Sequence, residues 1–522
     1  MIARRHLALA AVVAVAVLVY VPALHGPFTY DDRIEVVGNR ALRDIAAWDS
    51  IFRYNPSRAL LIASYAVNWA VGGLDPFGYH LTSVAIHAVN VALAWRLCRR
   101  TLGPEHGALA AALWAAHPMA SEAVAYIAGR SDALVATWWL AAANAWIDGR
   151  LLAAFAAWAA GLATKETAVA MPLLAWALEP WRAKAPDDGA RLRTVGIAAA
   201  TLPMLAVVTR LLVGGWPAPE VARSLAEQAV GQAGSWGLAA KLWAFPVGQS
   251  VLHDLGARVD AGSVAGFGVA VVVVLAARRP GPGRLAAVLW AAPLIPVAMF
   301  PAREVFAEHR AYLSGLGATV ALAARMPDRA RRAALLLVVP LALATWARAG
   351  VWADEIGLWT DAARKNPSSR DAAYGEGDAR RLAGDWTGAD DAYRRAIALR
   401  PGDVDARLNL GIVLAQRGRD DEARATWGDV LRDAPRTCAA HNNLGALSLR
   451  RGDVEAAVRS WTSTLRWCPD DPLAHLALGN LAADRGELPR AVFHLRKFVE
   501  LAPWGHPAER EARERLARLT RG

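Results

Sequence analysis

The sequence predicts an all-α protein with two parts, a polytopic membrane domain of about eleven helical spans followed by a tetratricopeptide-repeat (TPR) α-solenoid. Two observations predict this architecture. Runs with few or no charges recur through the first 350 residues, and prolines recur every 34 residues from position 367 onward. Hydrophobic residues make up 55% of the chain and the mean hydropathy is +0.22, which are high values for a soluble protein.

The membrane spans follow from the apolar runs and the basic clusters between them. A span needs roughly 20 apolar residues, or fewer with snorkelling flanks. Clusters of Lys and Arg favour the cytoplasmic side of a membrane. We therefore assign to that side the clusters at residues 4–5, 96–100, 182–193, 278–284 and 325–332. Eleven spans then lie near 7–24, 79–97, 107–124, 132–147, 150–163, 166–180, 194–213, 259–277, 285–300, 311–325 and 332–349. The stretch 235–252 fits an interfacial or re-entrant segment on the outer side.

This order of spans predicts the location of both ends of the chain. The run 7–24 lacks a clear small-x-small cleavage site before Pro22, so we expect a retained first span rather than a signal peptide. The protein is therefore expected in the bacterial inner (cytoplasmic) membrane, with a cytoplasmic N-terminus and an extracytoplasmic tail. Four polar segments face outward, at 25–78, 117–131, 164–166 and 301–310.

The net charge of +11 does not require a nucleic-acid partner. The tail from Pro367 holds 25 basic and 23 acidic residues, whereas the membrane part holds 33 and 24. The basic excess therefore lies beside the spans, where cytoplasmic loops and anionic lipid explain it.

The tail repeats with the TPR period of 34 residues. Three kinds of residue share this step: prolines at 367, 401, 435, 469 and 503, small residues at 377, 411, 445 and 479, and alanines at 389, 423, 457 and 491. We divide the chain into a transmembrane domain (1–350), a half repeat or linker helix (351–369), four TPR repeats (370–505) and a capping helix (506–522). Such an array binds an acceptor or a partner protein, or serves only as a scaffold.

Two cysteines fall in the third repeat. Cys438 begins its first helix and Cys468 ends its second, and these ends are neighbours in an antiparallel hairpin. An extracytoplasmic tail would favour a disulfide between them; two unpaired cysteines are the alternative. Cys98, near the cytoplasmic face, is expected to be unpaired.

Two adjacent carboxylates, Asp31 and Asp32, follow the first span directly. Such a pair is costly at this position unless it is solvated or used. The two residues could hold a divalent cation such as Mg²⁺ or Mn²⁺, or one could take a proton from an acceptor hydroxyl. A turn or a helix N-cap would explain them without any chemistry.

Further polar residues lie at three other span ends on the expected outer face. They are His117, Glu122, Tyr126, Arg130 and Asp132, then Lys165 and Glu166, then Glu308, His309, Arg310 and Tyr312. Arginine suits phosphate through its fork of donors, and a Lys–Glu pair at the membrane edge is a functional candidate by default. Structural alternatives are a satisfied helix end for His117 and a snorkelling ion pair for Lys165–Glu166. Cations and carboxylates on one face fit a phosphate-bearing donor together with a base or metal.

Several of these segments resemble one family. They are Asp31-Asp32 with Asn39, LDPFGYH at 74–80, HPMASEAVAYIAGRSD at 117–132, KET at 165–167 and AEHRAYL at 307–313. The chain resembles the transmembrane-and-TPR-containing O-mannosyltransferases and their bacterial relatives, which are C-type (GT-C) glycosyltransferases. The resemblance covers nearly the whole chain, and 117–132 is its most specific piece. Residues 55–58 and 313–315 depart from the pattern of many relatives.

The resemblance implies a hexosyltransferase that is inverting. It would move mannose or a similar hexose from a polyprenyl-phosphate donor to a protein or glycan acceptor on the outer face. Asp31 and Asp32 match the catalytic acidic motif, and either could be the base or a metal ligand. Arg130, Lys165 and Arg310 are then candidates for the lipid phosphate, with Glu122 and Glu308 orienting them.

Two other functions remain open from the sequence. A membrane-anchored TPR scaffold for an envelope complex would not need Asp31, Asp32 and Lys165 together. A lipid or glycan transporter would show charged residues near mid-span and a pseudo-repeat between its halves, and neither is clear here.

Overall fold

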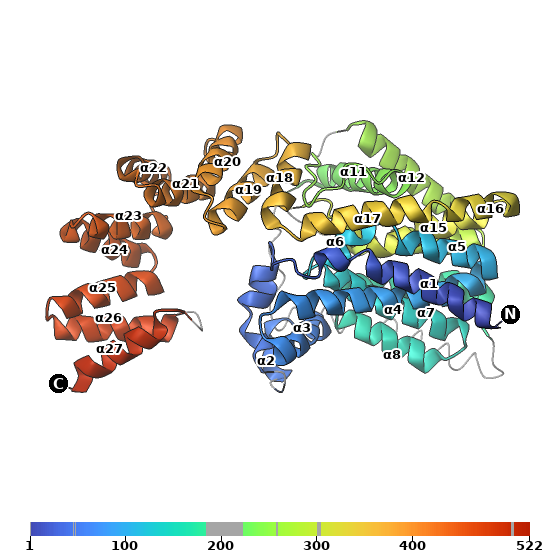
Figure 1. Cartoon of the computed structure of the whole chain (residues 1–522), viewed down its shortest axis with the longest axis horizontal. Coiled ribbons are helices and arrows are strands. Elements are labelled where there is room, and N and C mark those ends of the chain that lie inside the picture. The colour runs from blue at the N-terminus through green and yellow to red at the C-terminus, as the bar shows by residue number, and fades with distance from the viewer. Residues whose placement is uncertain are drawn as a thin grey trace. The chain divides into compact units, whose positions relative to one another are not determined.

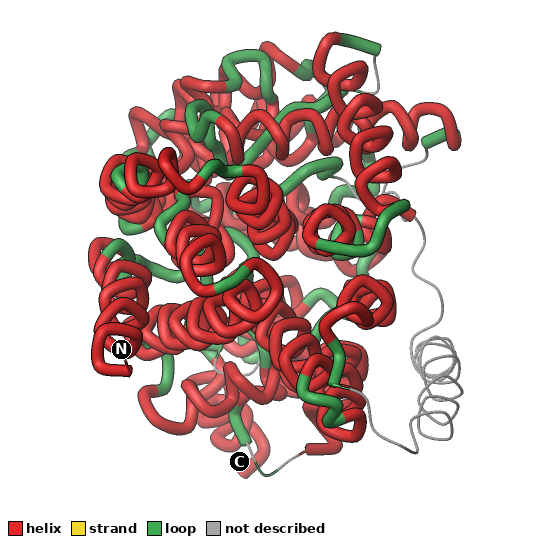
Figure 2. The backbone as a smooth tube through the Cα atoms, turned by 90° about the vertical axis from the view of Figure 1, so that its right-hand side faces the viewer, coloured by secondary structure: helices red, strands yellow, loops and turns green. Residues whose placement is uncertain are grey.

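The computed structural model describes residues 2–44, 46, 48–183, 223–256, 259–299, 304–502 and 506–521. These residues form helices joined by short connections, and no strand occurs among them (Figure 2). The chain divides into two compact units, Met1–Lys365 and Asn366–Gly522. The predicted all-α fold, with a helical membrane part and a TPR solenoid, is confirmed (Figure 1).

The first unit contains helices of very different length. They are α1 (Ile2–Leu18), α2 (Trp48–Tyr54), α3 (Ala59–Gly72), α4 (Pro76–Leu102), α5 (Pro104–Ala115), α6 (Ser121–Ala125), α7 (Arg130–Ile147), α8 (Leu151–Leu162), α9 (Met171–Leu178), α11 (Leu225–Ala244), α12 (Ala261–Ala277), α13 (Pro282–Ala291), α14 (Ile295–Met299), α15 (Tyr312–Arg325), α16 (Asp328–Leu335), α17 (Val338–Trp352) and α18 (Glu355–Lys365). The long helix α4 packs against α1, α5 and α7 (Figure 1).

Small residues set the closest helix contacts, as is usual where apolar surface alone gives no drive to associate in a membrane. A Cβ atom at Gly107 would lie 2.4 Å from the backbone nitrogen of Arg99, so only glycine lets α5 approach α4 this closely. Gly317 brings α15 equally near to α13, since a Cβ there would lie 2.6 Å from the carbonyl oxygen of Ala286.

The expected number of spans remains a prediction. Among the described residues, three helical stretches are long and apolar enough to cross a bilayer: His6–Ala23, Pro76–Leu102 and Asp328–Trp352. The expected span 107–124 is not one helix, because α5 ends at Ala115 and α6 begins only at Ser121. The expected span 194–213 lies outside the described residues.

The segment after α1 folds into a small domain-like layer with its own core. Short turns η2 (Arg33–Val37), η3 (Arg40–Leu42) and η4 (Pro56–Arg58) alternate with α2 and α3. The buried side chains of this layer are Val36, Leu42, Ile51, Leu61, Ile62, Tyr65 and Ala66, which pack with Tyr79 and Ile127. The layer is thereby held against the turn between α6 and α7.

The second unit is the predicted repeat array. Its helices are α19 (Arg370–Leu382), α20 (Trp386–Leu399), α21 (Val404–Gln416), α22 (Asp420–Asp433), α23 (Cys438–Arg450), α24 (Val454–Trp467), α25 (Pro472–Asp484), α26 (Leu488–Leu501) and α27 (Glu509–Arg521). A Cβ at Gly411 would lie 2.3 Å from the Trp427 ring, and one at Gly445 would lie 2.7 Å from Trp461. The periodic glycines are therefore the positions where the second helix of each pair places its large side chain.

A disulfide joins Cys438 at the start of α23 to Cys468 just after α24. It closes the two ends of one helical hairpin, which is the pairing that the repeat positions suggested. Cys98 is buried and unpaired.

We expect the Cys438→Ser variant to unfold its repeat array more easily than the wild type. A cross-link across 30 residues stabilises a fold by about 3–4 kcal/mol in the chain-entropy description. Pulse proteolysis of the full-length protein in urea measures this change. Wild-type protein treated with reductant should match the variant, and an unchanged midpoint after reduction would contradict the prediction.

Candidate active site

The two adjacent acids of the first loop face opposite ways. Asp32 is fully buried, and its carboxylate accepts hydrogen bonds from the backbone N–H of Thr29 at 3.0 Å and of Ala128 at 2.7 Å. Asp31 is exposed, and its backbone N–H donates to the Tyr126 hydroxyl at 3.1 Å. The hydrogen bond between Asp32 and Ala128 thus connects the loop to the turn after α6, and Asp31 remains exposed next to it.

Burial raises the pKa of Asp32 to about 7, although the hydrogen bonds from Thr29 and Ala128 oppose this shift. The charge of Asp31 adds to the rise. A carboxyl group whose pKa is raised on folding favours the folded state at low pH and loses that contribution as the pH rises through the folded pKa. Asp32 therefore becomes costlier to bury between about pH 4 and pH 7.

A chain of polar contacts connects Glu122 to Lys165 through His309 and Asp132. Glu122 on α6 accepts from the backbone N–H of His309 at 3.2 Å and contacts its Nδ1 at 2.7 Å. The other ring nitrogen of His309 lies 3.8 Å from Asp132, and Asp132 accepts from Lys165 Nζ at 2.6 Å. Lys165 also donates to Ser131 at 3.2 Å. Glu122, Asp132, Lys165 and His309, which the sequence placed on one face, are indeed brought together.

Arg310 lies beside this chain and is only partly buried. Its Nη1 donates to the carbonyl oxygen of Glu304 at 2.9 Å, and the Glu304 carboxylate accepts from the Tyr30 hydroxyl at 2.8 Å. Within the described ranges, no carboxylate forms an ion pair with Arg310. Its positive charge acts on the carboxylates of Glu304 and Glu166 without a direct ion pair to either.

Arg58 is a residue that sequence reasoning did not select as a ligand. It ends η4 and lies 3.6 Å from Glu166, whose side chain is half exposed. The charges of Arg58, Lys165 and Arg310 all act on Glu166. Residues 55–58 depart from the pattern of many relatives, and for this reason Arg58 was not selected from the sequence as a candidate ligand.

Arg130 is not brought to the exposed side of the site. Its guanidinium is fully buried and donates to Ser83 (3.1 Å), Ser64 (3.3 Å), Asn68 (2.8 Å) and the Tyr79 carbonyl (2.6 Å). Because these groups use its donors, Arg130 fastens α7 to α3 and α4, in contrast to the phosphate contact expected from the sequence.

His117 and Tyr312, two further residues of the predicted site, also lie in the interior. His117 stacks on Trp243 with ring centres 4.0 Å apart, and its Nε2 lies 3.1 Å from the carbonyl oxygen of Trp243. Tyr312 is fully buried, and its hydroxyl lies 2.7 Å from His87 Nδ1. Both positions fit packing roles.

Glu308 points to a different neighbour from the one expected. Its buried carboxylate accepts from the backbone N–H of Ser250 at 2.7 Å and lies 2.8 Å from His253 Nε2. It therefore anchors the segment after α11 rather than orienting Arg310.

The acid pair does not offer a ready cation site. Both Asp32 carboxylate oxygens already accept backbone hydrogen bonds. Among the residues that the structure describes, no three His, Cys, Asp or Glu side chains are grouped so that they could hold a metal ion. Both oxygens of Asp32 are thus engaged by the backbone of the first loop and of the turn before α7.

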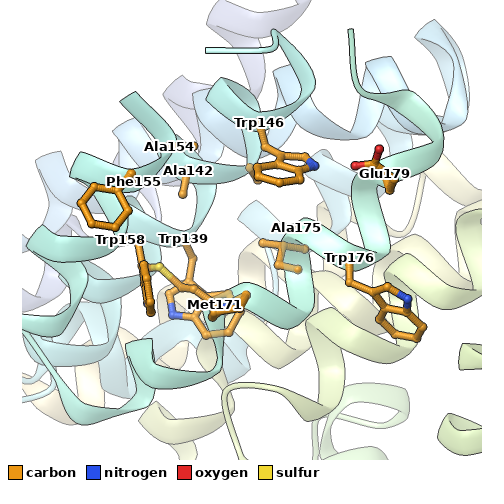
Figure 3. A pocket seen from close by; sticks show the side chains of 13 residues that line it. Trp139, Ala142, Trp146, Ala154, Phe155, Trp158, Met171, Ala175, Trp176 and Glu179 are labelled. Atoms are coloured by element: carbon orange, nitrogen blue, oxygen red, sulfur yellow. The ribbon is translucent and has the colours of Figure 1, made fainter. Parts of the chain in front are cut away.

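An apolar cavity of about 380 Å³ lies between α7, α8 and α9 (Figure 3). Its walls carry large aromatic side chains, and Glu179 stands at one end; the aromatic residues are Trp139, Trp146, Phe155, Trp158 and Trp176. The helices that form it end at the segments that carry Asp132 and Lys165. Such a lining suits a hydrocarbon chain.

Comparisons with known proteins agree with this architecture. Residues 65–207 match the dolichyl-phosphate-mannose-protein mannosyltransferase family, and 352–404, 374–439, 408–465 and 442–504 match the tetratricopeptide repeat. The protein O-mannosyl-transferase Tmtc2 of Drosophila melanogaster is 30% identical over 246 residues, which cover 42% of this chain and 26% of that protein. The human protein O-mannosyl-transferase TMTC2 is 32% identical over 133 residues, which cover 23% of this chain and 16% of that protein.

The matched region is thus about a quarter or less of these relatives' length. A solved structure of Pseudomonas aeruginosa PilF is 22% identical with a TM-score of 0.28, covering 33% of this chain and 80% of that one. A mannosyltransferase-family segment and TPR repeats occur together in this chain, so the resemblance inferred from its motifs is confirmed.

We expect Asp32→Asn to be less stable than the wild type at low pH, because an amide nitrogen would face one of the two backbone donors. Raising the pH from 5 to 8 should narrow this difference, since only the wild type must then bury a charge. One pKa unit corresponds to about 1.4 kcal/mol, so the change should be measurable as a shift in apparent Tm by thermal-shift fluorescence. A difference that stays constant with pH would contradict it.

We expect Arg130→Lys to destabilise the first unit by about 2–4 kcal/mol, because an ammonium group cannot reproduce the fork of donors. Thermal unfolding in detergent without any donor lipid measures this loss. Arg310→Lys is the matched control and should leave stability unchanged. Normal stability of Arg130→Lys with a raised KM for the donor would instead support a ligand role.

Proposed function

We propose that this chain is a membrane glycosyltransferase of the extracytoplasmic face. It transfers mannose or a similar hexose from a polyprenyl-phosphate donor to a protein or glycan acceptor. The observation that carries this proposal is the arrangement at the first loop. A buried Asp32 holds the loop to the turn before α7, and the exposed Asp31 follows Tyr30, whose hydroxyl donates to the same Glu304 that accepts from Arg310. The resemblance to protein O-mannosyl-transferases supports the class of reaction.

Asp31 acts as the general base in this proposal. It accepts the proton of the acceptor hydroxyl while the hydroxyl oxygen forms a bond to the anomeric carbon. The bond from that carbon to the phosphate oxygen breaks, and its electron pair leaves with the polyprenyl phosphate. Attack from the side opposite the phosphate inverts the anomeric configuration.

Cations near Asp31 receive the leaving phosphate. Arg310 contacts it directly, and Arg58 and Lys165 add positive potential from the same side. Fixed cations stabilise charge that grows on a leaving group without reorganising during the reaction. The partners that Arg58 and Lys165 already have, Glu166 and Asp132, limit them to this background role.

The apolar cavity between α7, α8 and α9 supports a lipid-linked donor. Its walls are mostly apolar and aromatic, and its helices lead to the segments of Asp132 and Lys165. A polyprenyl chain placed there would bring its phosphate toward the cations. A nucleotide-sugar donor has no hydrocarbon chain and would leave this cavity empty.

The repeat array binds the acceptor or a partner protein. A hollow of about 250 Å³ between the second and third repeats is lined by apolar Ile412 and Leu447 and by the amides of Gln416 and Asn443. Amide side chains can hydrogen-bond an extended peptide while apolar residues take its side chains. The disulfide in the third repeat supports an extracytoplasmic position for this unit.

We expect Asp31→Asn to lower sugar transfer by about 10²–10⁴-fold, because general-base catalysis typically contributes that much. Membranes containing wild type or variant are given a panel of radiolabelled polyprenyl-phosphate hexoses and an acceptor-protein extract. The control is Asp49→Asn on α2, an exposed acid that should have no effect. Full activity of Asp31→Asn, or transfer by the wild type from nucleotide sugars only, would overturn the proposal.

A further inference from the structure

Tyr30, the residue before the acid pair, has an unusual backbone. Its φ is +49°, and among the described residues it is the only one other than glycine with a positive φ. A bulky residue is rarely found in this region. Such strain persists where the surrounding structure enforces it, often at functional sites.

Several contacts hold Tyr30 in this conformation. Its hydroxyl donates to Glu304 at 2.8 Å, and its ring lies 5.6 Å from Trp359 in an edge-to-face arrangement. The Tyr126 ring, 6.3 Å away, is tilted by only 31°. Tyr126 in turn stacks on Trp352 at 5.3 Å. The Tyr30 ring is therefore fixed at one end and on its sides.

Tyr30 nevertheless keeps part of its surface exposed to solvent. Tyr30 is 37% exposed, whereas its neighbours Tyr126 and Trp359 are almost fully buried. Asp31, directly next in the chain, is exposed as well. The turn thus places a rigid aromatic surface beside the candidate base, with Arg310 bound to the same Glu304 that holds the Tyr30 hydroxyl.

An aromatic ring has a chemical use at this position. Its face carries partial negative charge and attracts cations. Glycosyl transfer passes through a transition state in which the sugar has oxocarbenium character, with positive charge near the anomeric carbon. Donation of the Tyr30 hydroxyl to a carboxylate increases the electron density of the ring and strengthens this attraction.

We infer that Tyr30 is the residue against which the transferred sugar lies, and that its ring stabilises the positive charge of the transition state. The inference rests on the proposed glycosyltransferase function and adds to it the element that positions the sugar. Asp31 then reaches the acceptor hydroxyl, Arg310 receives the phosphate, and Tyr30 stabilises the carbon between them.

Two variants distinguish the effect of the Tyr30 ring on activity from the effect of its backbone conformation. Tyr30→Gly removes the ring and adopts φ +49° without strain. Because the relief of strain opposes the loss of the contacts with Glu304 and Trp359, the apparent Tm should change little while kcat falls. Cation–π attraction of about 0.5–2 kcal/mol corresponds to a fall of about 2- to 30-fold. Tyr30→Phe keeps the ring and should lose less activity than Tyr30→Gly.

Fluorination of the ring provides the decisive measurement. Phenylalanine with one, two or three fluorine atoms is placed at position 30, which drains charge from the ring face with little change in shape. We expect log kcat for transfer from the donor to fall stepwise with each fluorine. The same series at Phe52, an exposed residue of α2, is the control and should be flat.

The outcomes distinguish this inference from the proposal on which it rests. A flat series at position 30, or full activity of Tyr30→Gly, with a wild type that transfers sugar and an inactive Asp31→Asn, would overturn the role of Tyr30 alone. A wild type that transfers sugar from no polyprenyl-phosphate donor would overturn both.

Discussion

The site depends on one buried carboxylate. Asp32 accepts the backbone N–H of Thr29 within its own loop and that of Ala128 in the turn before α7. The second hydrogen bond joins residues 96 positions apart, and burying the group raises its pKa to about 7. An exposed acid could not make this connection, and an unconnected loop could not hold Asp31 at a defined place. In the proposed function, Asp32 therefore has a structural role and Asp31 a chemical one.

The repeat array could be predicted almost completely from the sequence, because each repeat is a local unit with a fixed period. Gly411 and Trp427 lie within one repeat, and their contact follows from spacing alone. The membrane part was predicted less fully. The sequence did predict that Glu122, His309, Asp132 and Lys165 lie close together. Each was assigned to a span end on the same face of the membrane, and the structure brings these four side chains together.

The sequence could not show which of the candidate side chains are buried. Arg130 looked like a phosphate ligand, yet Ser64 and Asn68 of α3 and the Tyr79 carbonyl of α4 take up its donors. Those partners are polar residues within apolar helices, and nothing in their spacing marks them as ligands of one arginine. Tyr30 could not be selected from the sequence either, because the role inferred for it depends on a backbone angle and on Glu304, a residue 274 positions away.

Irregular backbone explains why the candidate residues meet where they do. The helix that would have continued from α5 breaks before His117, and a break within a membrane protein is tolerated only where its freed backbone groups find partners. Thr345 donates to the Ala116 carbonyl at 2.6 Å, Tyr65 donates to the Ile127 carbonyl at 3.0 Å, and Asp32 accepts from Ala128.

Each of these partners comes from a different element, so satisfying the break also gathers the first loop, α3 and α17 around it. Glu122 lies inside the broken stretch, while Lys165 and His309 lie at two other short turns, η6 (Glu166–Ala170) and η8 (Glu308–Ala311). Regular helices could not turn these polar groups toward one another. The loss of helix regularity is thus the structural condition for a polar site at this edge of the membrane domain.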